Sequence, residues 1–213
     1  MSPKVKQRFH QVIRNSGIRP QRALEVGGLM GEDSLLRFPE LAGAEERICL
    51  NLVELPSDGE VQAVKGNAND MSQFDKDSFD LVVCCSTLEH DKRFWLSVAE
   101  MKRVLRPSGL LVIGVPGYVK DAERDQGRST LTYRVHYSFD YYRFSEQAVR
   151  EVFFDGLERV RVRAVMTPPR IIGHGWKPRR PTPRMRAGRT VRAVRARSAP
   201  AIRAVRARIA QRP

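Results

Sequence analysis

Residues 78–90, SFDLVVCCSTLEH, and residues 94–117, FWLSVAEMKRVLRPSGLLVIGVPG, decide the fold of this chain. The run FDLVVCC at 79–85 is almost entirely apolar and predicts a buried strand. Residues 94–105 place apolar side chains on one helical face, and the Arg-Pro-Ser-Gly that follows predicts a turn. LLVIGV at 110–115 then predicts the next strand. Strand, helix and strand in this order indicate one unit of a parallel sheet.

The alternation of strands and helices continues on both sides of this unit. Towards the N-terminus the sequence predicts a helix over 3–15, a strand over 22–26, a helix over 33–44 whose regularity Pro39 limits, and strands over 47–52 and 61–65. Towards the C-terminus it predicts a helix capped by Ser145 and a strand over 160–165. The fold class is therefore α/β, an open and mostly parallel sheet whose ligand lies at the carboxyl ends of the central strands.

The positive charge of the chain is concentrated at its C-terminal end. The net charge is +14, and residues 177–213 carry thirteen Lys or Arg and no acidic residue, which leaves +1 for residues 1–176. We therefore divide the chain into a domain over 1–176 and an Arg-rich tail over 177–213. VRAVRAR at 191–197 recurs as IRAVRAR at 202–208. Three interpretations stay open: a solvated tail, a basic helix on anionic lipid, or a segment that binds nucleic acid or another polyanion.

Several features of the sequence indicate the cellular compartment of the protein. No run of about 18 apolar residues is present, so we do not expect a transmembrane span. No secretory signal is recognisable at the N-terminus, and Cys49, Cys84 and Cys85 form no C-x-x-C motif. These features favour a cytoplasmic protein with reduced cysteines.

A second informative stretch is ALEVGGLMG at 23–31, where a predicted strand runs into a glycine turn. Glycines there allow the backbone to approach a ligand closely and expose N–H groups. A tight turn without a ligand is the alternative. Asn51 follows the next predicted strand and could bond ribose hydroxyls. The run Asn67-Ala68-Asn69-Asp70 follows the third, where a polar side chain and a backbone N–H could bind an adenine edge.

Taken together, residues 20–166 resemble the class I S-adenosylmethionine-dependent methyltransferases, the small Rossmann-like ones. The resemblance rests on the order and spacing of the two stretches quoted first. It implies a Rossmann-like seven-stranded sheet with helices on both faces, S-adenosyl-L-methionine as cofactor and methyl transfer as activity.

The resemblance also implies roles for individual residues. Glu25, Gly27 and Gly28 would hold the methionine end of the cofactor, and the backbone at Cys85 or Ser86 would face it. Asn51 stands where the family usually has an acid for the ribose. Asn67, Ala68 or Asp70 would contact the adenine.

A hydroxyl acceptor requires a general base, and three histidines are candidates: His90, His136 and His174, the last within IIGHGWKP at 171–178. His90 follows the strand at 79–85, and His136 lies in an aromatic segment, YRVHYSFDYYRF at 133–144. This segment resembles the DYYRF-like part of small bacterial methyltransferases, including sugar O-methyltransferases, although it could simply pack as a lid. The residues predicted to bind an acceptor, a sugar by preference, are Tyr133, His136, Asp140, Tyr141, Tyr142 and Arg143.

Some enzymes of this kind use magnesium. Glu89, His90, Asp91 and Asp140 are conceivable Mg²⁺ ligands, but no ligand spacing in the sequence requires them. The function that follows is O-methylation of a small carbohydrate or glycan precursor, by a protein that could be a homodimer. Two alternatives are a non-catalytic protein that docks on a polyanion through its tail, and an RNA methyltransferase that uses the tail for capture.

Overall fold

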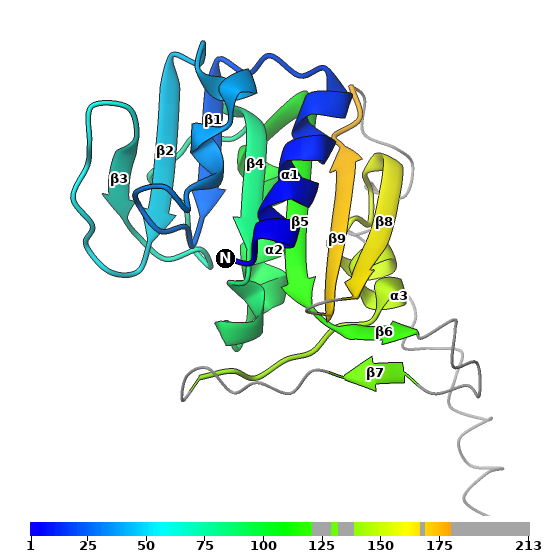
Figure 1. Cartoon of the computed structure of the whole chain (residues 1–213). Coiled ribbons are helices and arrows are strands. Elements are labelled where there is room, and N and C mark those ends of the chain that lie inside the picture. The colour runs from blue at the N-terminus through cyan, green and yellow to red at the C-terminus, as the bar shows by residue number, and fades with distance from the viewer. Residues whose placement is uncertain (121–128, 132–138, 167–168, 180–213) are drawn as a thin grey trace, which may run out of the picture. The chain divides into compact units, whose positions relative to one another are not determined.

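Seven strands form one sheet in the order β3-β2-β1-β4-β5-β9-β8 (Figure 1). The computed structural model describes residues 1–120, 129–131, 139–166 and 169–179. Strands β1 to β5 pair in parallel, and β9 is antiparallel to both β5 and β8. The predicted α/β fold with a mostly parallel, seven-stranded, Rossmann-like sheet is confirmed. The strands are β1 (Arg22–Val26), β2 (Glu46–Asn51), β3 (Gln62–Lys65), β4 (Phe79–Cys85), β5 (Leu105–Pro116), β8 (Glu158–Met166) and β9 (Pro169–Trp176).

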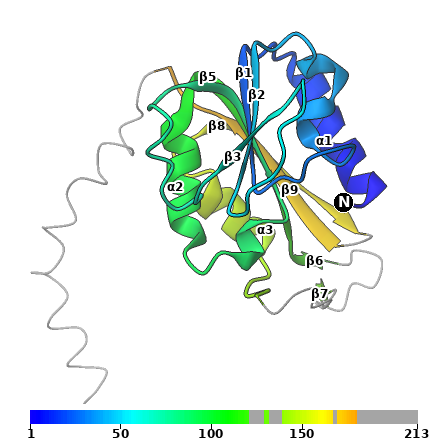
Figure 2. The ribbon, with the colours of Figure 1, turned by 90° about the vertical axis from the view of Figure 1, so that its left-hand side faces the viewer.

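Helices cover both faces of the sheet, as predicted (Figure 2). Helix α1 (Pro3–Ser16) lies on one face, and α2 (Phe94–Val104) and α3 (Glu146–Ala148) lie on the other. The π-helical turn η4 (Val149–Phe153) continues α3. The Ser145 hydroxyl accepts the amide of Ala148 at 3.0 Å, which confirms the predicted cap.

The structure differs from the prediction in four places. Residues 33–44 form two 3₁₀ turns, η1 (Leu35–Arg37) and η2 (Pro39–Leu41), instead of a helix, because Pro39 has no N–H to donate to a preceding turn. The predicted turn at Arg106-Pro107-Ser108-Gly109 lies inside β5, where the pairing with β4 shifts register. Strand β9 and the short hairpin of β6 (Tyr118–Lys120) and β7 (Ser129–Leu131) were not predicted.

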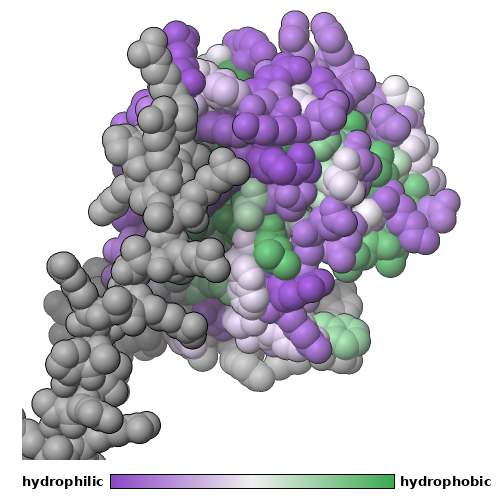
Figure 3. Space-filling view, turned by 180° about the vertical axis from the view of Figure 1, so that it is seen from behind, coloured by the Kyte–Doolittle hydropathy of each residue, from purple (hydrophilic) through white to green (hydrophobic). Residues whose placement is uncertain are grey.

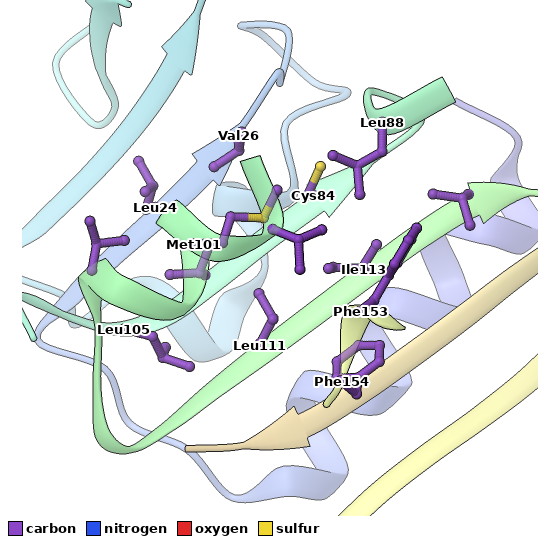
Figure 4. Close-up of a cluster of buried hydrophobic side chains, with 14 of the residues drawn as sticks. Leu24, Val26, Cys84, Leu88, Met101, Leu105, Leu111, Ile113, Phe153 and Phe154 are labelled. Atoms are coloured by element: carbon purple, nitrogen blue, oxygen red, sulfur yellow. The ribbon is translucent and has the colours of Figure 1, made fainter. Parts of the chain in front are cut away.

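The core consists of two apolar layers, one on each face of the sheet, because successive strand side chains point to opposite faces. In β4, Val82 and Cys84 belong to the layer under α2, whereas Leu81 and Val83 belong to the layer under α1. Figure 4 shows the α2 layer, in which Met101 lies near β1, β4 and β5. The outer surface on this side is mostly hydrophilic, with separate apolar areas (Figure 3). No helix in the described ranges is long and apolar enough to cross a membrane.

Met1–Arg179 is the first of the two units into which the chain divides. Lys177, the first residue of the predicted tail, lies in the first unit with its side chain 12% exposed. Its Nζ donates to Asp77 Oδ1 at 2.6 Å and to the carbonyl oxygens of Lys102 at 2.7 Å and Leu105 at 2.6 Å. These carbonyls end α2, where a cation interacts favourably with the helix dipole.

We expect Lys177→Met to lower the free energy of unfolding by about 2 kcal/mol, because it removes the charge-assisted bonds of an ammonium group that is only 12% exposed. Urea unfolding of the full chain measures this. Arg179→Met is the matched control, since Arg179 is exposed and bonds only Ser108 Oγ among the described residues, so its effect should stay within about 0.5 kcal/mol. Equal losses in the two variants would contradict the prediction.

Candidate functional site

A pocket of about 410 Å³ opens at the carboxyl ends of β1, β2, β3 and β4. The strand order reverses between β1 and β4, which is where open α/β sheets bind ligands. The volume lies in the range of small-molecule sites. The pocket is lined by Gly27, Leu50, Asn51, Leu52, Gly66, Asn67, Ala68, Asn69, Ser86, Thr87, His90, Asp91, Lys92, Arg93 and Ser97.

Gly27 is required by the local geometry at the end of β1. Its φ is +72°, and a Cβ on this residue would lie 2.3 Å from Cγ2 and Oγ1 of Thr87. Thr87 is itself fixed, because its hydroxyl donates to the carbonyl of Val26 at 3.2 Å. The backbone of Gly27 is also tied to β2 by its N–H, 2.7 Å from the carbonyl of Leu50. The glycine therefore brings the ends of β1 and β4 together at the wall of the pocket.

Glu25 and Gly28 do not line the pocket. The Glu25 side chain is 2% exposed and lies against Gly28, whose added Cβ would be 2.4 Å from the carboxyl carbon. Its Oε2 accepts the hydroxyl of Ser34 at 2.7 Å and the amide of Leu35 at 3.1 Å. Burial raises the pKa of Glu25 to about 7, although these hydrogen bonds oppose the rise. In this structure Glu25 holds η1 beside the glycine turn.

This pKa predicts a pH-dependent stability. The ordinary pKa of the group is 4.5, so the unfolded chain releases the proton at lower pH than the folded chain does. The free energy of unfolding should therefore fall as pH rises from about 4.5 to about 7, by at most about 3 kcal/mol from this group. Glu25→Gln keeps an acceptor for Ser34 and Leu35 and should remove this fall. Parallel pH profiles of wild type and Glu25→Gln in urea unfolding would contradict the assignment.

Asn51 ends β2 and connects it to the glycine turn. Its Nδ2 donates to the carbonyl of Gly28 at 2.8 Å, and its Oδ1 accepts the amide of Val53 at 3.2 Å. A side-chain amide has two donor hydrogens and two acceptor lone pairs. One of each remains for a ligand, so Asn51 has the capacity to bond a ribose diol.

A polar network forms another part of the pocket wall. Asn69 Nδ2 donates to Asp91 Oδ2 at 2.6 Å and to Ser97 Oγ at 2.7 Å, and Ser97 donates to the same carboxylate at 2.6 Å. Arg93 Nε donates to Asn69 Oδ1 at 3.2 Å. This network fixes the loop after β3, and with it Asn67 and Ala68, against the start of α2.

Asp70 does not line the pocket, and its Oδ1 accepts the amide of Ser72 at 3.2 Å. Ser86 does line it, with a φ of +54° and an N–H that donates to Gly114 at 2.9 Å. Cys85 is not among the lining residues, and burial raises the pKa of its thiol to about 12. A nucleophilic role for that thiol is therefore not supported.

His90 lies at the pocket in a defined orientation. Its Nδ1 is 2.9 Å from the carbonyl oxygen of Phe139. A carbonyl only accepts, so Nδ1 carries the hydrogen and Nε2 of the neutral ring has the lone pair. Oε1 of Glu89 lies 4.0 Å from this Nε2. Burial raises the pKa of Glu89, and its Oε2 has no hydrogen-bond partner in the structure as described.

The segment predicted to bind an acceptor is only partly described. Tyr133 and His136 lie outside the described residues. Asp140 and Arg143 form an ion pair whose side chains are 4% and 10% exposed, and the hydrogen bonds from Arg143 lower the pKa of Asp140. The amide of Tyr141 donates to the carbonyl of Glu89 at 2.8 Å, which brings the segment to His90. Tyr142 packs edge-on against Phe94 with ring centroids 5.2 Å apart and bonds the carbonyl of Lys92.

The conceivable magnesium ligands do not come together. Within the described ranges, no group of three or more His, Cys, Asp or Glu is arranged to hold a metal ion. Asp91 bonds Asn69 and Ser97, and Asp140 pairs with Arg143. The other two histidines lie away from the pocket lining: His10 contacts Glu40 at 2.9 Å, and His174 lies on β9.

Several pocket residues were not predicted, among them Thr87, Asn69, Arg93 and Ser97. Thr87 lies within the quoted stretch at 78–90, and Asn69 within the run at 67–70, but neither was singled out as a site residue. Arg93 and Ser97 carry no local signal, because they reach the pocket only where α2 packs against the loop after β3.

Comparisons with known proteins agree with this arrangement. Residues 42–113 match the family described as Methyltransferase domain. The sequence search of curated proteins finds no match.

Solved structures share the fold at low sequence identity. Burkholderia thailandensis 1,6-didemethyltoxoflavin-N1-methyltransferase, with S-adenosylhomocysteine bound, has a TM-score of 0.57 and 19% identity over 81% of this chain and 78% of its own. A chain of the complex that contains the Haloferax volcanii Trm112 methyltransferase activator has a TM-score of 0.59 and 17% identity, over 82% and 92%.

Phosphoethanolamine N-methyltransferase 2 of Haemonchus contortus, in complex with S-adenosyl-L-methionine, has a TM-score of 0.60 and 15% identity, and 52% of its own chain is covered. Sheet order, pocket position and domain match thus define a methyltransferase fold.

Proposed function

We propose that this protein is an S-adenosylmethionine-dependent methyltransferase. The observation that carries the proposal is the pocket at the reversal of strand order, with Gly27, Asn51, Asn67 and Ser86 on its walls. The chemistry of these residues fits the cofactor. Close backbone approach at Gly27 suits the methionine end, the remaining donor and acceptor of Asn51 suit the ribose, and Asn67 with Ala68 suits the adenine. Glu25 does not line the pocket and would act indirectly, by supporting the shape of the glycine turn.

A hydroxyl is the acceptor that the residues around His90 favour. S-adenosylmethionine, when bound, supplies an electrophilic methyl group on a sulfonium. The hydroxyl oxygen of the acceptor would bond the methyl carbon while the carbon–sulfur bond breaks. In the same step His90 Nε2 would take the hydroxyl proton. Burial raises the pKa of Glu89, but the imidazolium that forms 4.0 Å away would favour its ionised form, and that carboxylate would in turn stabilise the imidazolium. The hydrogen bond to Phe139 holds the ring in one orientation and leaves the lone pair on Nε2 in the neutral ring.

A small carbohydrate remains our proposed source of this hydroxyl. Tyr141 and Phe139 are 41% and 62% exposed beside His90, and aromatic faces of this kind suit a sugar ring. Asp140 and Arg143 bond each other, so they would position this segment and leave contact with the acceptor to the aromatic residues.

The first experiment is a calorimetric titration of the full chain with S-adenosylhomocysteine at moderate salt. Saturable one-site binding is the expected result, and it would justify a screen of sugar and glycan-precursor hydroxyls for methyl transfer. A folded sample that does not bind would overturn the proposed function.

A further inference from the structure

The edge strand β8 carries a row of exposed arginines. Arg159, Arg161 and Arg163 alternate along the strand, and all three side chains are exposed. Arg161 pairs with His174 of β9, and Arg163 pairs with Ile172. Because Ile172 belongs to the apolar layer under α1, the row faces the α1 side of the sheet. Figure 1 shows α1 in front of the central strands and no helix in front of β8.

Arg159 joins this row through a local irregularity. The pairing of β8 with β9 shifts register between Glu158 and Arg161, and Arg159 has a φ of +52°. Its guanidinium carbon lies 4.4 Å above the ring of Trp176. The stacking holds this cation on the same side as Arg161, because Trp176 packs against the apolar layer under α1.

Helix α1 contributes a fourth arginine. The helix contains no acidic residue, and Arg8 donates to Gln11 Oε1 at 3.1 Å. The pKa of the half-buried His174 is lowered, first by burial and then by the positive charges of Arg161 and Arg8. These two guanidinium groups therefore lie near the same imidazole, one from each element. We call Arg8, Arg159, Arg161 and Arg163 the arginine face.

The arginine face forms no ion pair within the described part of the chain, although Glu158 lies opposite Trp176 at the end of the row. Elsewhere in that part, arginines commonly pair with carboxylates, as do Arg22, Arg37, Arg47, Arg103, Arg106 and Arg143. None of the four residues of the arginine face forms such a pair with a described residue. Clustered cations without ion-pair partners create a positive potential that attracts an anionic partner.

The geometry suits a linear polyanion. Alternate residues on a strand are about 6.6 Å apart, so the row offers successive planar forks that match phosphate oxygens. The large apolar side chains that are exposed in the described part, such as Leu52, Trp95 and Phe139, lie outside this row, some of them at the carboxyl edge of the sheet. A membrane is therefore disfavoured as the partner. Base stacking is disfavoured because Arg159 covers Trp176.

We propose that the arginine face docks the sugar-phosphate backbone of a nucleic acid, without sequence preference. It is an interaction surface separate from the pocket, and it goes beyond methyl transfer. Charged residues on an edge strand also discourage pairing between sheets, and the test below separates that role from docking.

The test measures binding of a short fluorescein-labelled RNA hairpin to the full chain by anisotropy over a range of salt. Arg161→Glu with Arg163→Glu is compared with Arg150→Glu with Lys76→Glu, a control that reverses two exposed cations elsewhere. We expect the first pair to weaken binding at least about tenfold more than the control. It should also reduce the slope of log affinity against log salt by about 1.4 to 1.8, the loss of two phosphate contacts. Arg161→Lys with Arg163→Lys should keep most of the affinity, since the charge remains.

Equal effects of the two double variants would overturn the proposal, because binding would then follow net charge alone. If Arg161→Glu with Arg163→Glu lost binding to phosphatidylglycerol vesicles but kept RNA binding, the proposal would also be overturned, and the arginine face would be a lipid-binding surface. The same titration with a DNA duplex shows which nucleic acid binds more tightly. If the affinity for neither RNA nor DNA changed in the arginine variants, docking on this face would be rejected. Titration with S-adenosylhomocysteine should be the same in all variants, so this test and that of the proposed function fail independently.

Discussion

Gly27→Val is expected to abolish saturable binding of S-adenosylhomocysteine. Even a single Cβ at this position would lie 2.3 Å from two atoms of Thr87 and 2.8 Å from its Cβ, so a rotation of the Thr87 side chain cannot relieve the contact. The ends of β1 and β4 would have to separate, and the wall of the pocket would move with them. Calorimetric titration of the purified full chain measures the loss. Gly27→Ala should show a graded version, with affinity reduced at least about tenfold, or about 1.4 kcal/mol.

Gly31→Val is the matched control for this prediction. Gly31 lies in the same turn with a φ of +86°, so a side chain there causes the same kind of backbone strain. An added Cβ at Gly31 meets nothing within 4 Å, however, and Gly31 does not line the pocket. We expect Gly31→Val to lower stability while it retains most of the affinity. If both valine variants lost binding equally, general strain in the turn would explain the result, and the contact with Thr87 would not.

His90→Gln is expected to lower turnover by about 10²–10⁴-fold, the usual effect of removing a general base. The measurement is methyl transfer to a hydroxyl acceptor identified in the screen. The Gln side chain retains a donor that can reach the carbonyl of Phe139, so the local structure should persist. Affinity for S-adenosylhomocysteine should stay within about twofold, since removal of a base acts on the chemical step.

His136→Gln provides the comparison, because both histidines are candidates for the base. A loss at His136 that exceeds the loss at His90 would assign the base to His136 and leave His90 as a pocket residue. A loss below tenfold at both positions would reject general-base catalysis by either histidine. An acceptor that needs no base, such as an amine, would then become the better hypothesis.

The sequence determined most of the architecture, because it depends on local pattern. The apolar run at 79–85 became β4 with the predicted bounds, and the amphipathic residues from Phe94 became α2. The glycine turn was also visible in the sequence, since only glycine adopts such a backbone without strain. Segments with conflicting local signals were predicted less well, as at 33–44, where Pro39 replaced a helix by 3₁₀ turns.

Strand β9 shows what local pattern misses. Its sequence, PRIIGHGW, contains two glycines, which weaken a strand prediction. The reason for them lies in another element, because a Cβ at Gly173 would be 2.4 Å from the ring of Phe154, and at Gly175 3.1 Å from it. The glycines make room for a phenylalanine about 20 residues earlier in the chain.

The direction of individual side chains in the site was decided by tertiary contacts. Glu25 was predicted to hold the cofactor, and in the structure its carboxylate bonds Ser34 and Leu35 under the turn. Asn69 gains its role from Asp91 and Ser97, which are 22 and 28 residues away. Periodicity and turn chemistry act over a few residues and can be read from the chain, whereas hydrogen-bond partners and charge clusters form only when distant segments meet. The sequence thus determined that a pocket exists at the ends of these strands, and the tertiary structure decided which side chains line it.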